Sequence, residues 1–162
     1  MVWSACNDAV AVAFVKKYQA GAAWLAGSVH VPVEFILGVA ASETGYGGKG
    51  NFVQYSNFFS MHAKSPDDLP WLATGVVEAA ATVHHKHPVY VAKYASFETC
   101  GLSFIAKYGK AIFGISTPKD FALALQGAGF NPGDARKGGN PKFVDDLVSV
   151  IDVVKLRLSC PA

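Results

Sequence analysis

Apolar residues recur at the spacing of one helical face in five stretches of the chain. The predicted helices begin near Asn7, Pro32, Ser96, Thr117 and Asn140. Ser96 and Thr117 are expected as caps, the first helix should end near Gln19, and the helix from Ser96 should reach Lys107. The second is the clearest, because its apolar residues fall at i, i+3, i+4, i+7 and i+8: Val33, Ile36, Leu37, Ala40 and Ala41. Proline suits the first position of this helix, and a cluster of glycines from Gly45 onward ends it.

Two other stretches are rich in β-branched residues and lack helical spacing. They cover Val76–Ala80 and Val89–Tyr94, with a polar, histidine-rich segment between them, so we expect a small β-hairpin. Residues 46–75 are rich in Gly, Asn, Ser and Pro, which is typical of a long functional loop. The chain has 162 residues, the length of one domain. We therefore predict a single domain over residues 1–162, mainly α (α+β), with a small β-hairpin lobe.

The composition excludes several classes of protein. Hydrophobic residues make up 51% of the chain and charged residues 16%, against about 25% charged in an average soluble domain, which rules out disorder. The net charge is only +2 and no run of Lys or Arg is present, so no nucleic-acid partner is expected. No apolar run approaches the ~18 residues of a membrane span. We expect a monomer with no membrane partner.

The three cysteines do not have the spacing of a metal site. Cys6, Cys100 and Cys160 lie far apart in the sequence, with no C-x-x-C pair among them. We expect three ordinary thiols. The alternative is a bridge from Cys6 to Cys160, which would require an oxidising compartment.

A histidine cluster is the other candidate for metal binding. His84, His85 and His87 lack the i, i+4 spacing of helical zinc ligands, and Pro88 prevents a helix here. The pattern favours a solvated turn, so neither a metal nor a cofactor is expected.

Glu43 is the strongest candidate for a catalytic residue. It lies two helical turns after Ile36 and so borders the apolar stripe of its helix. It also occupies the last turn, where the negative end of the helix dipole disfavours a carboxylate. Burial and the dipole both favour the protonated form, which a glycosidase needs to protonate its leaving oxygen. A lone Glu at a helix end is more often a surface residue, so the neighbouring residues decide between these readings.

Four segments, in the same order along the chain, resemble glycoside hydrolase family 73, the glucosaminidases that include the flagellar rod-cap muramidase domain. Residues 36–47, ILGVAASETGYG, resemble the family's helix end, in which Glu is followed by Ser or Thr, Gly, an aromatic and Gly. Residues 56–62, SNFFSMH, are similar to its Asn-Asn-Leu-Phe-Gly-Ile-Lys segment, and residues 94–100 to its Tyr-x-Ser segment. Residues 121–122 and 127–130 resemble its Phe-Ala and Ala-Gly-Tyr elements.

The resemblance implies a lysozyme-like fold, with Glu43 at the foot of a cleft between a helical body and a β lobe. The implied substrate is the β-1,4 bond between N-acetylglucosamine and N-acetylmuramic acid in peptidoglycan. The substrate-binding residues that it implies are Tyr46, Asn57, Phe59, Tyr94 and Phe130. Two positions depart from the family: Cys100 replaces a Ser, and Phe130 replaces a Tyr.

A second catalytic carboxylate is expected in the β lobe. Related enzymes often have a Glu sixteen residues before the Tyr of the Tyr-x-Ser segment, and Glu78 has this spacing from Tyr94. There it could activate a water across the cleft from Glu43, which would imply inversion. The competing reading is a solvent-facing strand residue. Asp67 and Asp68 are the other candidates, although they fit loop and cap positions better.

Four other functions are alternatives for this sequence. A lytic transglycosylase of the goose-lysozyme kind, or a phage endolysin, would use the same Glu43. A non-catalytic wall-binding module would keep the fold, but it has no need of an acid at the helix end. A zinc amidase would use the histidine cluster instead.

The sequence also raises the question of how the protein reaches its substrate. Lys16 and Lys17 follow the apolar stretch of residues 9–15, whereas a signal peptide has basic residues in front. We therefore expect a chain made in the cytoplasm without a signal peptide, which acts in the periplasm of a target bacterium or otherwise at the cell wall. In this it resembles the glycoside hydrolase toxins delivered by type VI secretion. Such a toxin implies an immunity protein that occludes the cleft around Glu43.

Overall fold

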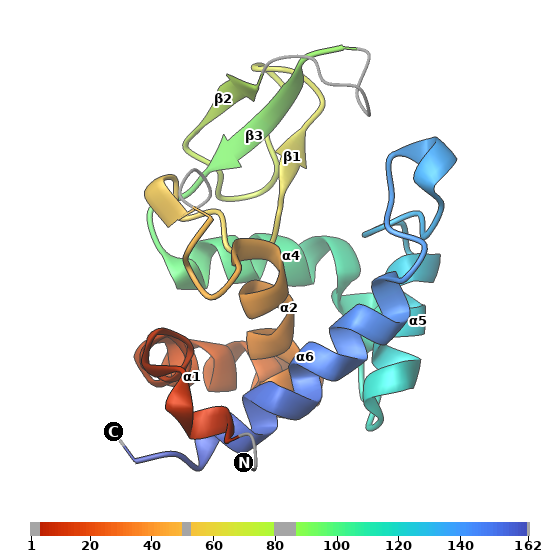
Figure 1. Cartoon of the computed structure of the whole chain (residues 1–162). Coiled ribbons are helices and arrows are strands. Elements are labelled where there is room, and N and C mark those ends of the chain that lie inside the picture. Colours follow the sequence, from red (N-terminus) through yellow and green to blue (C-terminus); the bar gives the residue numbers. More distant parts are fainter. Residues whose placement is uncertain (1–3, 50–52, 80–86, 162) are drawn as a thin grey trace.

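The computed structural model describes residues 4–49, 53–79 and 87–161. Within these ranges a body of helices carries a small three-stranded lobe (Figure 1). The helices are α1 (Ala9–Val29), α2 (Val33–Thr44), α4 (Phe97–Ile112), α5 (Pro118–Gly127) and α6 (Phe143–Leu158), with short 3₁₀ turns at Ala5–Asn7 and Ala135–Lys137. The strands are β1 (His62–Ala63), β2 (Gly75–Ala79) and β3 (Val89–Lys93). No helix in the described ranges combines the length and apolar character needed to cross a membrane.

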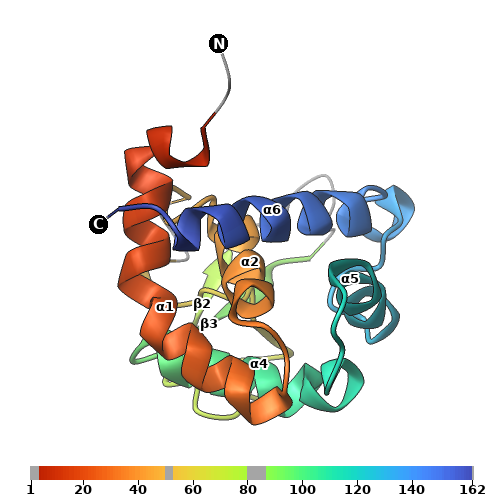
Figure 2. The same cartoon turned by 90° about the horizontal axis from the view of Figure 1, so that it is seen from below.

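Helix α2 lies at the centre of the body, with α1, α4, α5 and α6 around it (Figure 2). The sequence predicted one apolar face, but every residue from Phe35 to Ala41 is buried. The packing against α6 is so close that a Cβ on Gly38 would come within 2.5 Å of Cγ1 of Ile151. The end of α2, with Glu43 on it, is therefore held on a rigid support.

Helix α1 is longer than the sequence predicted. We expected it to end near Gln19, but it continues to Val29, where His30 adopts a left-handed conformation with φ 56°. Gly21, which weakens the helical pattern, lies where α1 approaches α4, and a Cβ there would come within 2.6 Å of Oε1 of Glu98. Close packing of the two helices thus outweighs the low helix propensity of glycine.

The predicted β-hairpin is present. Strands β2 and β3 pair in antiparallel fashion, and β1 adds to the other edge of β3, giving the order β1-β3-β2. In this register Glu78 is opposite Tyr90, and Val77 is opposite Val91. Residue 80 and the histidine-rich segment up to residue 86 lie outside the described residues. The two-residue strand β1 was not predicted, because it is too short to show alternation.

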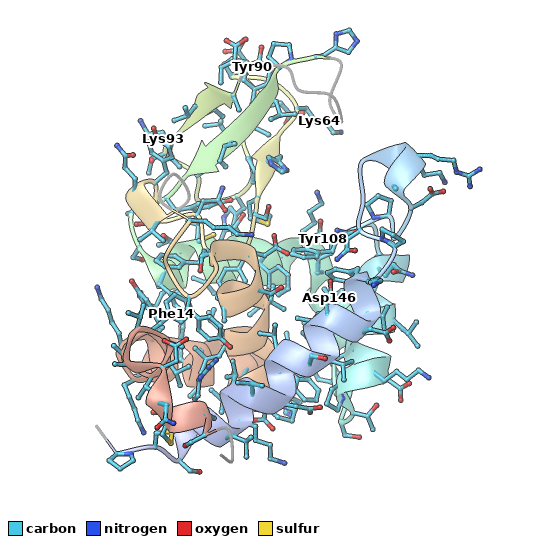
Figure 3. All side chains as sticks on the ribbon, viewed as in Figure 1. Phe14, Lys64, Tyr90, Lys93, Tyr108 and Asp146 are labelled. Carbon is cyan, nitrogen blue, oxygen red and sulfur yellow. A yellow bond between two sulfur atoms is a disulfide. The ribbon has the colours of Figure 1, made fainter. Side chains whose placement is uncertain are left out.

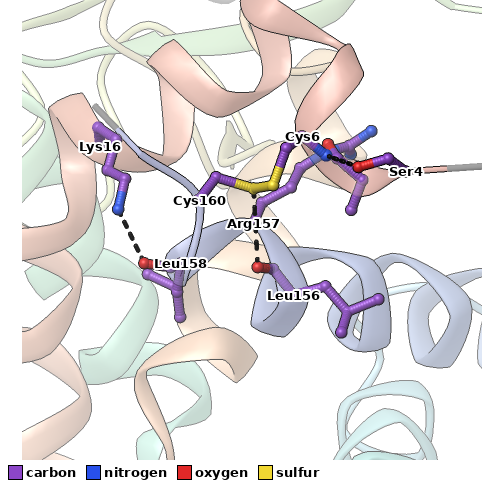
Figure 4. The surroundings of a disulfide bond; sticks show 8 residues. Ser4, Cys6, Lys16, Leu156, Arg157, Leu158 and Cys160 are labelled. Carbon is purple, nitrogen blue, oxygen red and sulfur yellow. Dashed lines mark hydrogen bonds between the residues drawn. A yellow bond between two sulfur atoms is a disulfide. The ribbon is translucent and has the colours of Figure 1, made fainter.

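The expectation of three free thiols is wrong. Cys6 and Cys160 form a disulfide that joins the two ends of the chain, with Cα atoms 5.6 Å apart (Figure 4). Hydrogen bonds fix the same junction, because Nε of Arg157 donates to the Ala5 carbonyl and Nζ of Lys16 donates to that of Leu158. Cys100 is free and buried. The mainly α, lysozyme-like architecture with a small β lobe is confirmed.

Candidate active site

A cleft of about 500 Å³ opens between the end of α2 and the β lobe. Helix α2 contributes Glu43, and the other lining residues are 60–62, 79, 89, 91, 107, 108, 129–132, 137 and 138. Figure 3 shows Tyr108 on α4, between the lobe and the C-terminal helices. Helical body, β lobe and the loop after α5 therefore all meet at Glu43.

The environment of Glu43 favours its protonated form. The residue lies next to the last position of α2, and its carboxyl is largely removed from solvent. Burial raises the pKa of this carboxyl, while a hydrogen bond from Ser60 and the charge of Lys49 lower it by less. The net shift is upward, as the sequence predicted. A largely buried carboxyl that faces a cleft and has a raised pKa is suited to general acid catalysis.

The loop that carries Ser60 is held by Asn57. Its amide Nδ2 donates to the carbonyls of Met61 and Ala92, and its Oδ1 accepts from the Met61 N–H at 2.8 Å. Asn57 is 0% exposed, so these bonds tie the loop to β3. In this structure Asn57 belongs to the hydrogen-bond network of its own loop and does not line the cleft, so its contact with substrate stays a prediction. Its hydrogen bonds position Ser60 beside Glu43.

Two more residues expected at the substrate belong to the core. Phe59 is fully buried and stacks on Phe104 at 4.9 Å between ring centroids. Tyr94 is also buried, and its hydroxyl shares a 2.7 Å hydrogen bond with that of Ser103. Burial raises the pKa of Tyr94 to about 12. Neither side chain lines the cleft, because both are used to pack the loop of residues 57–61 and β3 against α4.

Tyr46 also lies away from the cleft. It follows α2 in a left-handed conformation, φ 55°, which turns its ring toward α1 and α6. There the ring contacts Phe14, and the guanidinium of Arg157 lies 4.8 Å from its centroid. Burial raises the pKa of the Tyr46 hydroxyl, and the neighbouring Arg157 partly opposes this. In this structure Tyr46 therefore packs at the junction of the chain ends, and its contact with substrate stays a prediction.

Glu78 is on the wrong face of β2 to meet Glu43. Side chains alternate along a strand, and Ala79 lines the cleft together with Val89 and Val91 of β3. Glu78 is exposed and shares the opposite face with its partner Tyr90. The structure thus does not place Glu78 across the cleft, and its catalytic role stays a prediction.

Phe130 is the one expected substrate-binding residue that the structure places in the cleft. Its ring packs edge-on against Tyr108 at 5.3 Å. No pattern in the sequence pointed to Tyr108 or Lys107, because they come at or beyond the predicted end of their helix. Ser60 lay within a recognised segment, but only the folded loop shows that it reaches Glu43.

Metal-binding groups are not assembled in the described part of the chain. No group of three or more His, Cys, Asp or Glu residues is arranged to hold an ion there. His84 and His85 lie outside the described residues, and His87 is exposed.

Two solved structures are similar to this chain over nearly their whole length. A chain of a type VI secretion system effector–immunity complex from Pseudomonas protegens is 35% identical with a TM-score of 0.78, covering 96% of this chain and 99% of that one. The peptidoglycan hydrolase from Sphingomonas sp. A1 is 30% identical with a TM-score of 0.72, covering 91% and 92%.

A third structure shares the fold at lower identity. The C-terminally truncated glycoside hydrolase domain of Salmonella typhimurium FlgJ is 22% identical with a TM-score of 0.65, covering 90% of this chain and 97% of that domain. No protein-family model and no curated protein matches the sequence. The two higher identities extend across almost the full length of both relatives, and this chain therefore belongs to the peptidoglycan hydrolases of the glycoside hydrolase family 73 type.

Proposed function

We propose that this protein cleaves the β-1,4 bond between N-acetylglucosamine and N-acetylmuramic acid, with Glu43 as general acid. One observation carries the proposal: Glu43 faces the cleft as a carboxyl whose pKa is raised by burial. A glycosidic oxygen must receive a proton as its bond to the sugar breaks. A carboxyl whose pKa is raised holds its proton to higher pH than an exposed one, and it can deliver that proton where the bond lies.

A lytic transglycosylase is the second candidate, and the cleft itself favours it. Among the described residues that line the cleft, Glu43 is the only carboxylate. An inverting hydrolase needs a second carboxylate as base on the far side of the bond, whereas a transglycosylase can use one Glu and form an anhydro-sugar. Mass spectrometry of the released sugars separates the two, because hydrolysis adds a water to the product and transglycosylation does not.

The variant Glu43→Gln tests the role of the acid. It removes the proton while keeping the shape of the side chain, and general acid catalysis typically contributes about 10²–10⁴-fold. We expect the clearing of purified peptidoglycan to fall by at least about a hundredfold, with the circular dichroism spectrum unchanged. Cleavage by the variant at a rate near that of the wild type would show that Glu43 is not the acid.

We further propose that the protein is an antibacterial toxin delivered to the periplasm by type VI secretion. The relative in an effector–immunity complex supports this. The partner would be an immunity protein that inserts a few residues into the concave site beside Glu43.

Expression in a bacterium with and without an added periplasmic signal peptide tests delivery and partner together. We expect toxicity only on export, its loss in the exported Glu43→Gln variant, and its relief by the product of the neighbouring gene. If the exported enzyme is harmless although it is active in vitro, the proposal that the protein is a toxin is contradicted.

A further inference from the structure

A second pocket, of about 180 Å³, lies beside the cleft at the foot of the β lobe. Met61, His62 and Lys107 line both spaces, so the pocket is a side branch of the cleft. Figure 3 labels Lys64 on the lobe and Tyr108, the neighbour of Lys107, on α4 below it. A polymer chain that occupied the cleft would therefore direct any substituent on this side into the branch.

Positive charge predominates in the side branch. Lys64 and Lys107 line it, with Asp68 as its single acid. The ion pairs found among the described residues involve neither lysine. The ammonium of Lys107 is held 5.4 Å from the centre of the Tyr108 ring, at the junction of the two spaces. Both lysines are exposed, so they can receive an anionic group.

Apolar side chains form the remaining wall of the branch. Leu69 and Pro70 belong to the loop after β1 and line the pocket with the two lysines. A wall of this kind contacts small aliphatic groups, whereas the hydroxyl-rich face of a bare sugar prefers hydrogen-bonding partners. The chemistry of the branch thus suits a short peptide with carboxylates.

We propose that the side branch binds the acidic stem peptide that the muramic acid residue carries on its lactyl group, with Lys64 and Lys107 pairing with its carboxylates. This deepens the proposed function and rests on it, because the glycan must lie in the cleft for its stem to enter the branch. The enzyme then prefers glycan strands that bear peptides over strands from which an amidase has removed them.

The test measures kcat/KM on peptide-bearing and on peptide-stripped strands, and takes the ratio of the two. For the wild type we expect a ratio of about ten. Lys64→Met and Lys107→Met keep the aliphatic stem of the side chain, and each should lower the ratio about threefold, in line with solvent-exposed charge pairs. The double variant should bring it close to one. Lys110→Met is the matched control, since Lys110 is also exposed on α4 but lines neither space.

Two results would overturn the proposal: equal cleavage of both substrates by the wild type, or a wild-type ratio in the double variant. A failure of the proposed function looks different, because the wild type would then release sugars from neither substrate. A titration of the wild type with a synthetic acidic stem peptide, followed by NMR, reports on the branch without turnover. We expect shifts of the amides of Lys64, Leu69 and Lys107 that the double variant lacks, and their absence in the wild type would also overturn the proposal.

Discussion

Ser60 has a backbone conformation that glycine usually adopts. Its φ is 52°, and the family segment that residues 56–62 resemble has a glycine at this point. The serine in this chain adds a hydroxyl that bonds to the carboxyl of Glu43 and lowers its pKa against the effect of burial. At the scale of single residues, the pKa of Glu43 thus depends on two opposing effects, burial and the hydrogen bond from Ser60.

Removal of the Ser60 hydroxyl should shift the pH dependence of cleavage. The variant Ser60→Gly fits the left-handed backbone and takes away the bond that favours the carboxylate, so the pKa of Glu43 rises further. Because the acid must be protonated, activity is lost as the pH rises through this pKa. We therefore expect the alkaline limb of the pH–rate profile to move to higher pH.

The variant Ser60→Ala provides the control for the backbone. It loses the same hydroxyl but keeps a Cβ at positive φ, which costs about 1–2 kcal/mol. It should show the same pH shift as Ser60→Gly, but a lower melting temperature than Ser60→Gly, because only the glycine removes the strain that Ser60 itself carries. If the alkaline limb of the pH–rate profile stays in place in both variants, Ser60 does not influence the pKa of Glu43.

At the scale of secondary structure, the features that the sequence predicted correctly are those that depend on nearby residues. Ser96 and Thr117 cap α4 and α5 as expected, because a cap depends on residues within one helical turn. The end of α1 and the burial of α2 on all sides were missed, since both depend on helices distant in the sequence. In the same way, the family segments pointed to Glu43, which lines the cleft, but they did not predict the direction of the Tyr46 side chain, because the turn after α2 decides it.

The orientation of β2 leads to a prediction for Glu78. In the hairpin register it faces away from the cleft, and it could act as a base only if the lobe turned its other face inward. If the lobe keeps this orientation on the substrate, Glu78→Gln will retain most of the wild-type turnover on purified peptidoglycan. A loss of a hundredfold or more, with the fold intact, would show that the lobe rearranges on the substrate and that Glu78 is the missing base.

At the scale of the whole molecule, the bond between Cys6 and Cys160 closes nearly the entire chain, with a sequence separation of 154. A cross-link over so long a loop restricts the unfolded state strongly. The two chain ends that it joins lie at the opposite end of the body from the β lobe (Figure 1). Its effect should therefore be on stability and not on the chemistry at Glu43.

The double variant Cys6→Ser, Cys160→Ser measures this effect. We expect a loss of about 2–4 kcal/mol in unfolding free energy, or roughly 5–15 °C in melting temperature for a chain of this size. The kcat/KM at 25 °C should be unchanged. Reductant should lower the melting temperature of the wild type but not that of the variant, and an equal response of both would exclude the disulfide as the cause.

The same bond decides how the molecule bears mechanical force. Tension applied to the two ends of a chain follows the shortest covalent path, which here crosses the two sulfur atoms and bypasses every helix and strand between them. Once the bond is reduced, the same pull can draw out roughly 500 Å of chain. A machine that threads polypeptides through a narrow channel must therefore admit the oxidised protein as a doubled strand or as a folded particle, and only the reduced protein can pass as a single file of residues.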